Sequence, residues 1–100
     1  PVVVTPEELP PGASGLRITS RVNGETRQDS NTADMIFSTE KIISILSEFM
    51  TLESGDVIAT GTPSGVAHAM KPPGWMKDGD VVEVEIEEIG ILSNPVALEK

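Results

Sequence analysis

The dipeptide Asn23-Gly24 is the feature that most restricts how this chain can fold. A type I′ turn needs a positive φ at both central residues, and Asn followed by Gly adopts that geometry readily. Before the turn, apolar and polar residues alternate from Leu16 to Val22, which is the pattern of a half-buried strand. The sequence therefore predicts a β-hairpin in which Glu25 to Gln28 pairs with this strand, followed by a polar loop at residues 29–32.

Further strands are predicted in the second half of the chain. Apolar residues at 82, 84 and 86 alternate with glutamates, which indicates a strand with one buried face and one acidic, solvated face. The apolar run Val57 to Thr60 is typical of a short buried strand. Residues 89–92 and 96–98, on either side of Asn94-Pro95, are expected to form a last pair of short strands.

One helix is predicted. After Ser38 or Thr39 as N-cap, apolar residues recur at helical spacing as far as Met50. We expect this amphipathic helix to run from about Thr39 to Met50 and to pack its apolar stripe against a sheet. The predicted fold class is therefore mainly β (α+β).

Composition narrows the class of protein. The 100 residues include 16 acidic and 7 basic side chains, for a net charge of -9, and no cysteine. A phosphate-binding face needs clustered Lys and Arg, so nucleic acid and anionic membrane surfaces are poor partners. There is neither a membrane-length apolar run nor a signal-peptide pattern at the first residues, and the absence of cysteine fits a reducing compartment. We expect a cytoplasmic protein.

The acidic strand invites a metal-binding interpretation. Glu83, Glu85, Glu87 and Glu88 carry the oxygen ligands that hard cations take. Alternate residues of a strand lie about 6.6 Å apart, however, and no neighbouring residue type completes a site. We therefore expect a solvated face here.

His68 is the only imidazole of the chain and stands between two alanines. Its usual pKa would suit general acid–base work. Its position in the aperiodic stretch 66–76 favours an ordinary surface loop instead.

The segment Gly61-Thr62-Pro63-Ser64-Gly65 is the most site-like feature of the sequence. Two glycines allow close approach of the backbone, and Thr62 and Ser64 add hydroxyl groups that could hold a carboxylate or a phosphate. A tight turn at the exit of a strand explains the same residues equally well. No Lys follows the second Gly as in a Walker loop, and Ser64 does not lie in a Gly-x-Ser-x-Gly motif.

A second set of polar side chains lies between the hairpin and the helix. Arg27, Gln28, Asn31 and Asp34 could form a network with a role in a site. Short polar side chains in a connecting loop more often brace that loop through bonds to nearby backbone, and this is what we expect of them.

Four strings together resemble the fumarylacetoacetate hydrolase family. They are Arg21-Val22-Asn23-Gly24-Glu25 running into Gln28-Asp29-Ser30-Asn31-Thr32, then Asp34-Met35-Ile36-Phe37, then residues 55–66, and then residues 79–86. Residues 71–73, 79–80 and 87–90 look closest to fumarylacetoacetate hydrolase domain-containing proteins and to 2-oxo-hept-3-ene-1,7-dioate hydratases or isomerases. The resemblance covers nearly the whole chain.

The resemblance implies a mixed β-sandwich roll and a homodimer. It also implies an enzyme that uses Mg²⁺, Mn²⁺ or Ca²⁺ on small 2-oxo acid substrates, such as those of aromatic catabolism. The expected reactions are C–C bond hydrolysis of acylpyruvates, and isomerisation or decarboxylation through a metal-bound enolate.

The resemblance also assigns residues. Thr62, with the adjacent backbone at Gly61, matches the family position that binds the substrate carboxylate. The family's metal ligands and catalytic side chains lie upstream of the segment that Pro1 resembles, so no catalytic or metal residue is assigned to this chain. Residues 1–100 are then expected to be a partial catalytic domain, the C-terminal half. The alternative is a non-catalytic fragment that serves as core and dimer-forming module.

Overall fold

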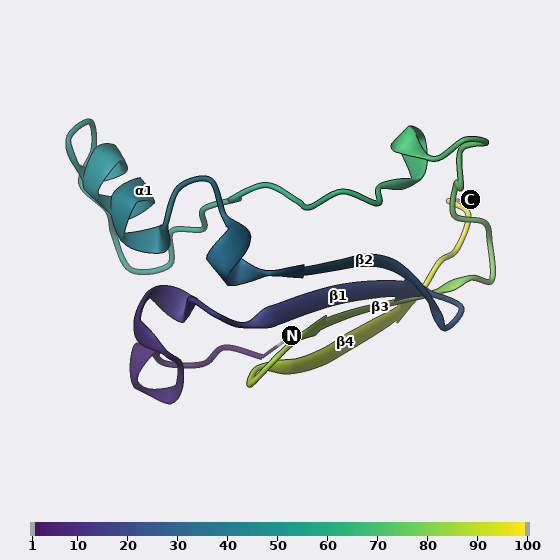
Figure 1. Ribbon diagram of the computed structural model, residues 1–100, viewed down its shortest axis with the longest axis horizontal. Coiled ribbons are helices and arrows are strands. Elements are labelled where there is room, and N and C mark those ends of the chain that lie inside the picture. Colours follow the sequence, from purple (N-terminus) through teal and green to yellow (C-terminus); the bar gives the residue numbers. More distant parts are fainter. Residues whose placement is uncertain (1, 100) are drawn as a thin grey trace.

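The computed structural model, which describes residues 2–99, contains four strands that form one antiparallel sheet in the order β2-β1-β3-β4 (Figure 1). The strands are β1 (Arg17–Val22), β2 (Glu25–Asn31), β3 (Val81–Ile86) and β4 (Gly90–Pro95). The α-helix α1 is Thr39–Ser47, and short 3-10 turns are found at Pro6–Glu8, Pro11–Ala13, Thr32–Asp34 and Ala67–Ala69. The predicted mainly β fold with one helix is confirmed. Every strand pairing within residues 2–99 is antiparallel, so this part of the chain contributes a single sheet to the implied roll.

The hairpin forms where the sequence predicts it. Asn23 and Gly24 have φ values of 52° and 80°, the left-handed conformations of a type I′ turn. Strand β2 runs to Asn31, which pairs with Arg17, so the loop predicted at residues 29–32 is wrong over its first three residues. The Arg17 guanidinium donates to both Asp29 oxygens, from Nε at 3.0 Å and from Nη2 at 2.7 Å, across this part of the ladder.

A β-bulge interrupts the pairing of β1 with β2. Ser20 lies opposite Gln28, but the next residue, Arg21, lies opposite Thr26, which leaves Arg27 as the extra residue. Successive side chains of a strand point to opposite faces, and one extra residue reverses that alternation. Thr26 and Gln28 therefore face opposite sides of the sheet.

Helix α1 begins as predicted and ends early. The Ser38 hydroxyl accepts a hydrogen bond from the Lys41 backbone N–H at 3.2 Å, so Ser38 is the N-cap. The helix stops at Ser47, three residues before the predicted end, and Figure 1 shows it beyond one end of the sheet. Its apolar stripe is not packed on the sheet: no residue of α1 is buried, and Ile43 is 44% exposed.

Three predicted strands are corrected. Residues 57–60 form no strand within the described part of the chain; they belong to an extended segment with Val57 93% exposed. The last two predicted strands are replaced by the single strand β4, whose pairing with β3 continues through Asn94 to Pro95. Residues 57–60 have a strand-like sequence, but they have no neighbouring strand among residues 2–99 to pair with.

The buried core of this segment is small. Among residues 2–99, only Leu16 and Thr19 are buried, at 2% and 8% exposure. The accessible surface is 7850 Å², whereas a folded monomer of 10.6 kDa exposes about 5,500 Å². The radius of gyration is 15.7 Å, against about 13 Å for a compact domain of this length. The fold thus leaves much more apolar surface uncovered than a free-standing domain of its size would. No helix in residues 2–99 has the length and apolar character needed to cross a membrane.

Candidate functional site

A groove of about 570 Å³ brings the two predicted polar regions together. Residues 60–64 line it with residues 30–32 and 34–37, and Ile18 of β1 and Ile42 of α1 add apolar surface. Gly61 and Thr62 both lie in its lining, and Thr62 is exposed to it. The structure therefore places residues 61–65, called the ligand loop below, at a concave surface with polar and apolar walls, the kind of surface where small ligands bind.

Strand β2 holds the ligand loop in place through Gln28. Its side-chain Nε2 donates to the Thr62 hydroxyl oxygen at 2.6 Å and to the Pro63 carbonyl oxygen at 2.9 Å. Its Oε1 accepts from the Ser20 hydroxyl at 2.8 Å. These contacts fix the position of the loop against the sheet, although the loop has no strand pairing of its own.

The two glycines of the loop serve different needs. Gly65 has a φ of 112°, and a Cβ placed on it would overlap the backbone carbonyl oxygen of Arg27. At this position the backbone of the loop approaches that of β2 too closely for a residue with a Cβ. Gly61 has a φ of 97° with open space around it, so only its backbone conformation requires glycine.

The polar side chains at the end of the hairpin divide between two tasks. Asn31 accepts a hydrogen bond from the Ala33 backbone N–H at 2.9 Å, which braces its own loop as predicted. Gln28 and Arg27 instead reach distant loops, since Arg27 Nη1 donates to the Gly74 carbonyl oxygen at 3.0 Å. Asp34 lines the groove. The single network suggested by the sequence is thus replaced by local and long-range bonds.

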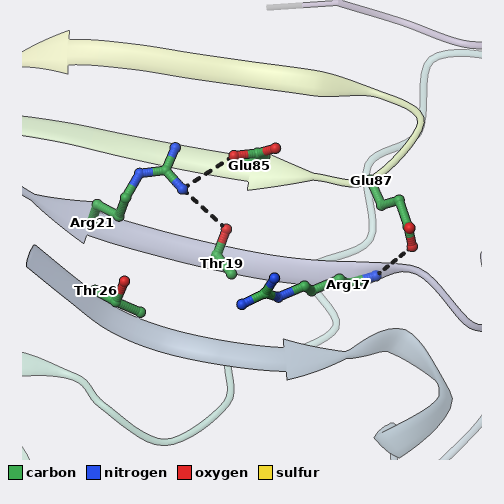
Figure 2. Close-up of a pocket in the computed structure, with 6 residues that line it drawn as sticks. All are labelled: Arg17, Thr19, Arg21, Thr26, Glu85 and Glu87. Atoms are coloured by element: carbon green, nitrogen blue, oxygen red, sulfur yellow. Dashed lines mark hydrogen bonds and ion pairs between the residues drawn. The ribbon is translucent and has the colours of Figure 1, made fainter. Parts of the chain in front are cut away.

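The opposite face of the sheet carries a smaller pocket of about 260 Å³, drawn in Figure 2. The Arg21 guanidinium lies 3.1 Å from Glu85 and 3.5 Å from Glu83 and donates to the Thr19 hydroxyl, while Glu87 accepts from the Arg17 backbone N–H. The acidic face predicted for this strand is therefore neutralised in part by arginines of β1. The two arginines and two glutamates in the lining balance in charge, so the pocket favours neither anionic nor cationic ligands.

The carboxylate of Asp29 belongs to this charged face. A hydrogen bond from Arg17 holds the pKa of Asp29 below its usual range, and the same bond raises the pKa of Arg17. Both side chains are largely exposed, at 46% and 66%, so the pair contributes little to stability.

His68 and the glutamates do not assemble a reactive centre with the loop. His68 is exposed and its ring centroid lies 5.6 Å from that of Trp75, outside the lining of the groove. Among residues 2–99 there is no cluster of three or more His, Asp or Glu side chains that could hold a metal ion.

Sequence reasoning missed the importance of Gln28 for the loop. The residue sits in a strand of mixed polarity, and only the bulge at Arg27 turns its side chain toward the groove. It also missed Phe37 and Ile42, which line the groove. Ile42 belongs to the apolar stripe that the sequence predicts to pack against a sheet, and the sequence predicts no role for Phe37.

Comparisons with known proteins bear on this groove. The sequence pattern described as fumarylacetoacetate (FAA) hydrolase C-terminal matches residues 1–97. The oxaloacetate tautomerase YisK of Bacillus subtilis is 51% identical over 81 residues, which are 81% of this chain and 27% of that protein.

Two solved structures extend the likeness to the fold. Fumarylacetoacetate hydrolase from psychrophilic Exiguobacterium antarcticum superposes with a TM-score of 0.91 and 48% identity, over 99% of this chain and 35% of its own. Maleylpyruvate hydrolase from Sphingobium sp. SYK-6, in complex with manganese(II) and pyruvate, gives a TM-score of 0.82 and 33% identity over 95% of this chain and 33% of its own. The chain thus spans about a third, or less, of the length of these relatives.

Proposed function

Because the chain belongs to the fumarylacetoacetate hydrolase family, we propose that it supplies the carboxylate-binding loop of an enzyme that acts on 2-oxo acids. The observation that carries this proposal is the position of the Thr62 hydroxyl in the lining of the groove, held there by Gln28. Oxaloacetate and pyruvate, named for two of the relatives, are both small 2-oxo acids with a carboxylate next to the keto group. The Thr62 hydroxyl and the adjacent backbone at Gly61 are groups that suit that carboxylate.

The reaction we propose is tautomerisation, isomerisation or C–C bond hydrolysis of a 2-oxo acid. Metal dependence is part of the proposal, because one relative was solved with manganese(II). The residues described here do not fit a resident Mg²⁺, Mn²⁺ or Ca²⁺ ion, since residues 2–99 contain no suitable ligand cluster. We therefore place the ligands in parts of the parent protein outside this chain.

We also propose that the chain is the C-terminal part of a larger catalytic domain. The accessible surface of 7850 Å² and the exposure of Val57 support this, because such surface is normally covered in a folded protein. The relatives' greater length offers the covering residues. A homodimer and a cytoplasmic location, both expected from the sequence, stay predictions.

The test uses the full-length parent protein with oxaloacetate and Mn²⁺. Charge-assisted hydrogen bonds contribute about 1.5–3 kcal/mol, so Thr62→Val should lower kcat/KM by about ten- to a hundredfold. Thr62→Ser, which keeps the hydroxyl, should be milder. Thr26→Val is the matched control on the opposite face of the sheet and should retain full activity.

Three outcomes distinguish a carboxylate-binding loop from a plain turn and from a non-catalytic module. Loss of kcat/KM in Thr62→Val alone supports the carboxylate role. Unchanged kinetics in that variant would return residues 61–65 to a plain turn. Absence of turnover in the wild type with oxaloacetate, acylpyruvates and each of the three metals would favour the non-catalytic module.

A further inference from the structure

The β-bulge at Arg27 aims one amide side chain at the ligand loop. Without the extra residue, Gln28 would share a face with Thr26, which lines the charged pocket on the far side of the sheet. With it, Gln28 lies on the groove side and its Nε2 is 2.6 Å from Thr62 Oγ1. Bulges often redirect a side chain near functional sites.

The orientation of the Gln28 amide follows from its partners. The Pro63 carbonyl oxygen can only accept hydrogen bonds, so the group that faces it must be the NH₂. The amide oxygen then faces Ser20, whose hydroxyl donates to it at 2.8 Å. Both hydrogens of the NH₂ are used, one on Pro63 and one on Thr62.

The orientation of the Gln28 amide decides what the Thr62 hydroxyl can do. Nε2 is a donor without an acceptor lone pair, so Thr62 Oγ1 must accept from it. The hydrogen of the Thr62 hydroxyl is therefore not used by Gln28. It is left for a group in the groove that accepts hydrogen bonds.

We propose that Gln28 is a positioning residue that keeps the Thr62 hydroxyl hydrogen available for an acceptor, such as a carboxylate, at this point of the groove. The inference rests on the proposed function and adds a residue to it. In this proposal Gln28 acts through the ligand loop, by its bonds to Thr62 and Pro63, and touches no substrate. Thr62 Oγ1 keeps a second lone pair, so the network favours an acceptor by presenting the hydroxyl hydrogen and does not itself exclude a donor.

The closing experiment is a double-mutant cycle in the full-length protein with oxaloacetate as the probe. Gln28→Glu keeps the size of the side chain but turns the donor into an acceptor that takes the Thr62 hydrogen, so KM should rise by about ten- to a hundredfold with kcat little changed. Gln28→Met removes the orienting bond but leaves the hydrogen, so its KM should rise less. In the Thr62→Val background, Gln28→Met should have a smaller effect on KM, because only the loss of the Pro63 bond then remains.

Controls separate positioning from folding. Thr26→Val should leave KM and the Tm unchanged, and a crystal structure of Gln28→Met should show Thr62 in altered or multiple rotamers. If Gln28→Glu does not fold, the cycle with Gln28→Met still decides the question. A Gln28→Met effect that persists undiminished in the Thr62→Val background, or no effect of either substitution on KM, would overturn the inference. If Thr62→Val itself has normal kinetics, the proposed function fails instead.

Discussion

Asn23, in the hairpin turn, donates from its side-chain Nδ2 to the Asp80 Oδ1 atom at 2.8 Å, although 57 residues separate the two in the sequence. The Asn23 Oδ1 atom accepts from the Val81 backbone N–H at 2.8 Å, and Asp80 Oδ2 accepts from the Lys77 backbone N–H at 2.8 Å. The turn that joins β1 to β2 is thereby bonded to the turn that precedes β3. The two turns together fix one end of the central strand pair, β1 and β3.

The first prediction concerns the pH dependence of this contact. The Lys77 backbone N–H, and after it Asn23, hold the pKa of the Asp80 carboxyl below its usual range. A carboxyl with a lowered folded-state pKa stabilises the fold above the usual pKa of about 4, and that stabilisation disappears as the pH falls through the lowered value. Asp80→Asn should therefore lower the Tm of the full-length protein at pH 7, and the difference from wild type should shrink below about pH 4.

Thermal melts at a series of pH values check this prediction. Glu7→Gln, in the N-terminal 3-10 turn, is the control and should leave the Tm at pH 7 unchanged. A Tm difference for Asp80→Asn that stays constant down to about pH 2 would mean that the carboxylate charge has no part in the contact.

The second prediction compares the two glycines of the ligand loop. Gly65→Ala combines a positive φ with overlap of the Arg27 carbonyl oxygen, so the loop or the bulge must move. We expect a loss of about 3 kcal/mol in the free energy of unfolding. Gly61→Ala carries only the conformational strain and should lose about 1 kcal/mol. Denaturant titrations measure both, and equal losses would show that the contact with Arg27 does not restrict the loop.

The third prediction concerns the charged face in Figure 2. Arg21 is 21% exposed and holds two carboxylates and the hydroxyl of buried Thr19, so Arg21→Met should lose about 1 kcal/mol of stability. Arg17 is 66% exposed, and Arg17→Met should leave the Tm almost unchanged. Raising the salt concentration should reduce the effect of Arg21→Met. A larger loss for Arg17→Met than for Arg21→Met would contradict this ranking.

Local signals predicted the sheet well because they do not depend on what surrounds them. Asn23-Gly24 sets its own turn geometry, and the alternation at residues 82–86 specifies a strand whichever neighbour it has. The predictions for residues 57–60 and for the packing of α1 depend on partners, and residues 2–99 do not contain them. An apolar run indicates that a segment is to be covered, but it does not say by what.

The ligand loop was predicted only in part, because only its glycines give a local signal in the sequence. Glycines at 61 and 65 indicate unusual backbone and are visible in the sequence, as the φ values confirm. The anchor of the loop was not visible, because the role of Gln28 depends on a bulge two residues after the start of β2 and on a contact 34 residues away. No periodic pattern in one strand shows where a single extra residue will be placed.

The bulge at Arg27 gives strand β2 two phases. Before the bulge, Thr26 faces the charged pocket. After it, Gln28 and the alternate residues that follow face the groove. A hydrophobicity profile with a period of two, fitted across the whole strand, averages these phases and finds little signal. A substitution scan from Glu25 to Asn31 should show that the alternation between tolerant and sensitive positions shifts by one residue at Arg27. Deleting that residue would exchange the two faces of half the strand while leaving its composition almost unaltered.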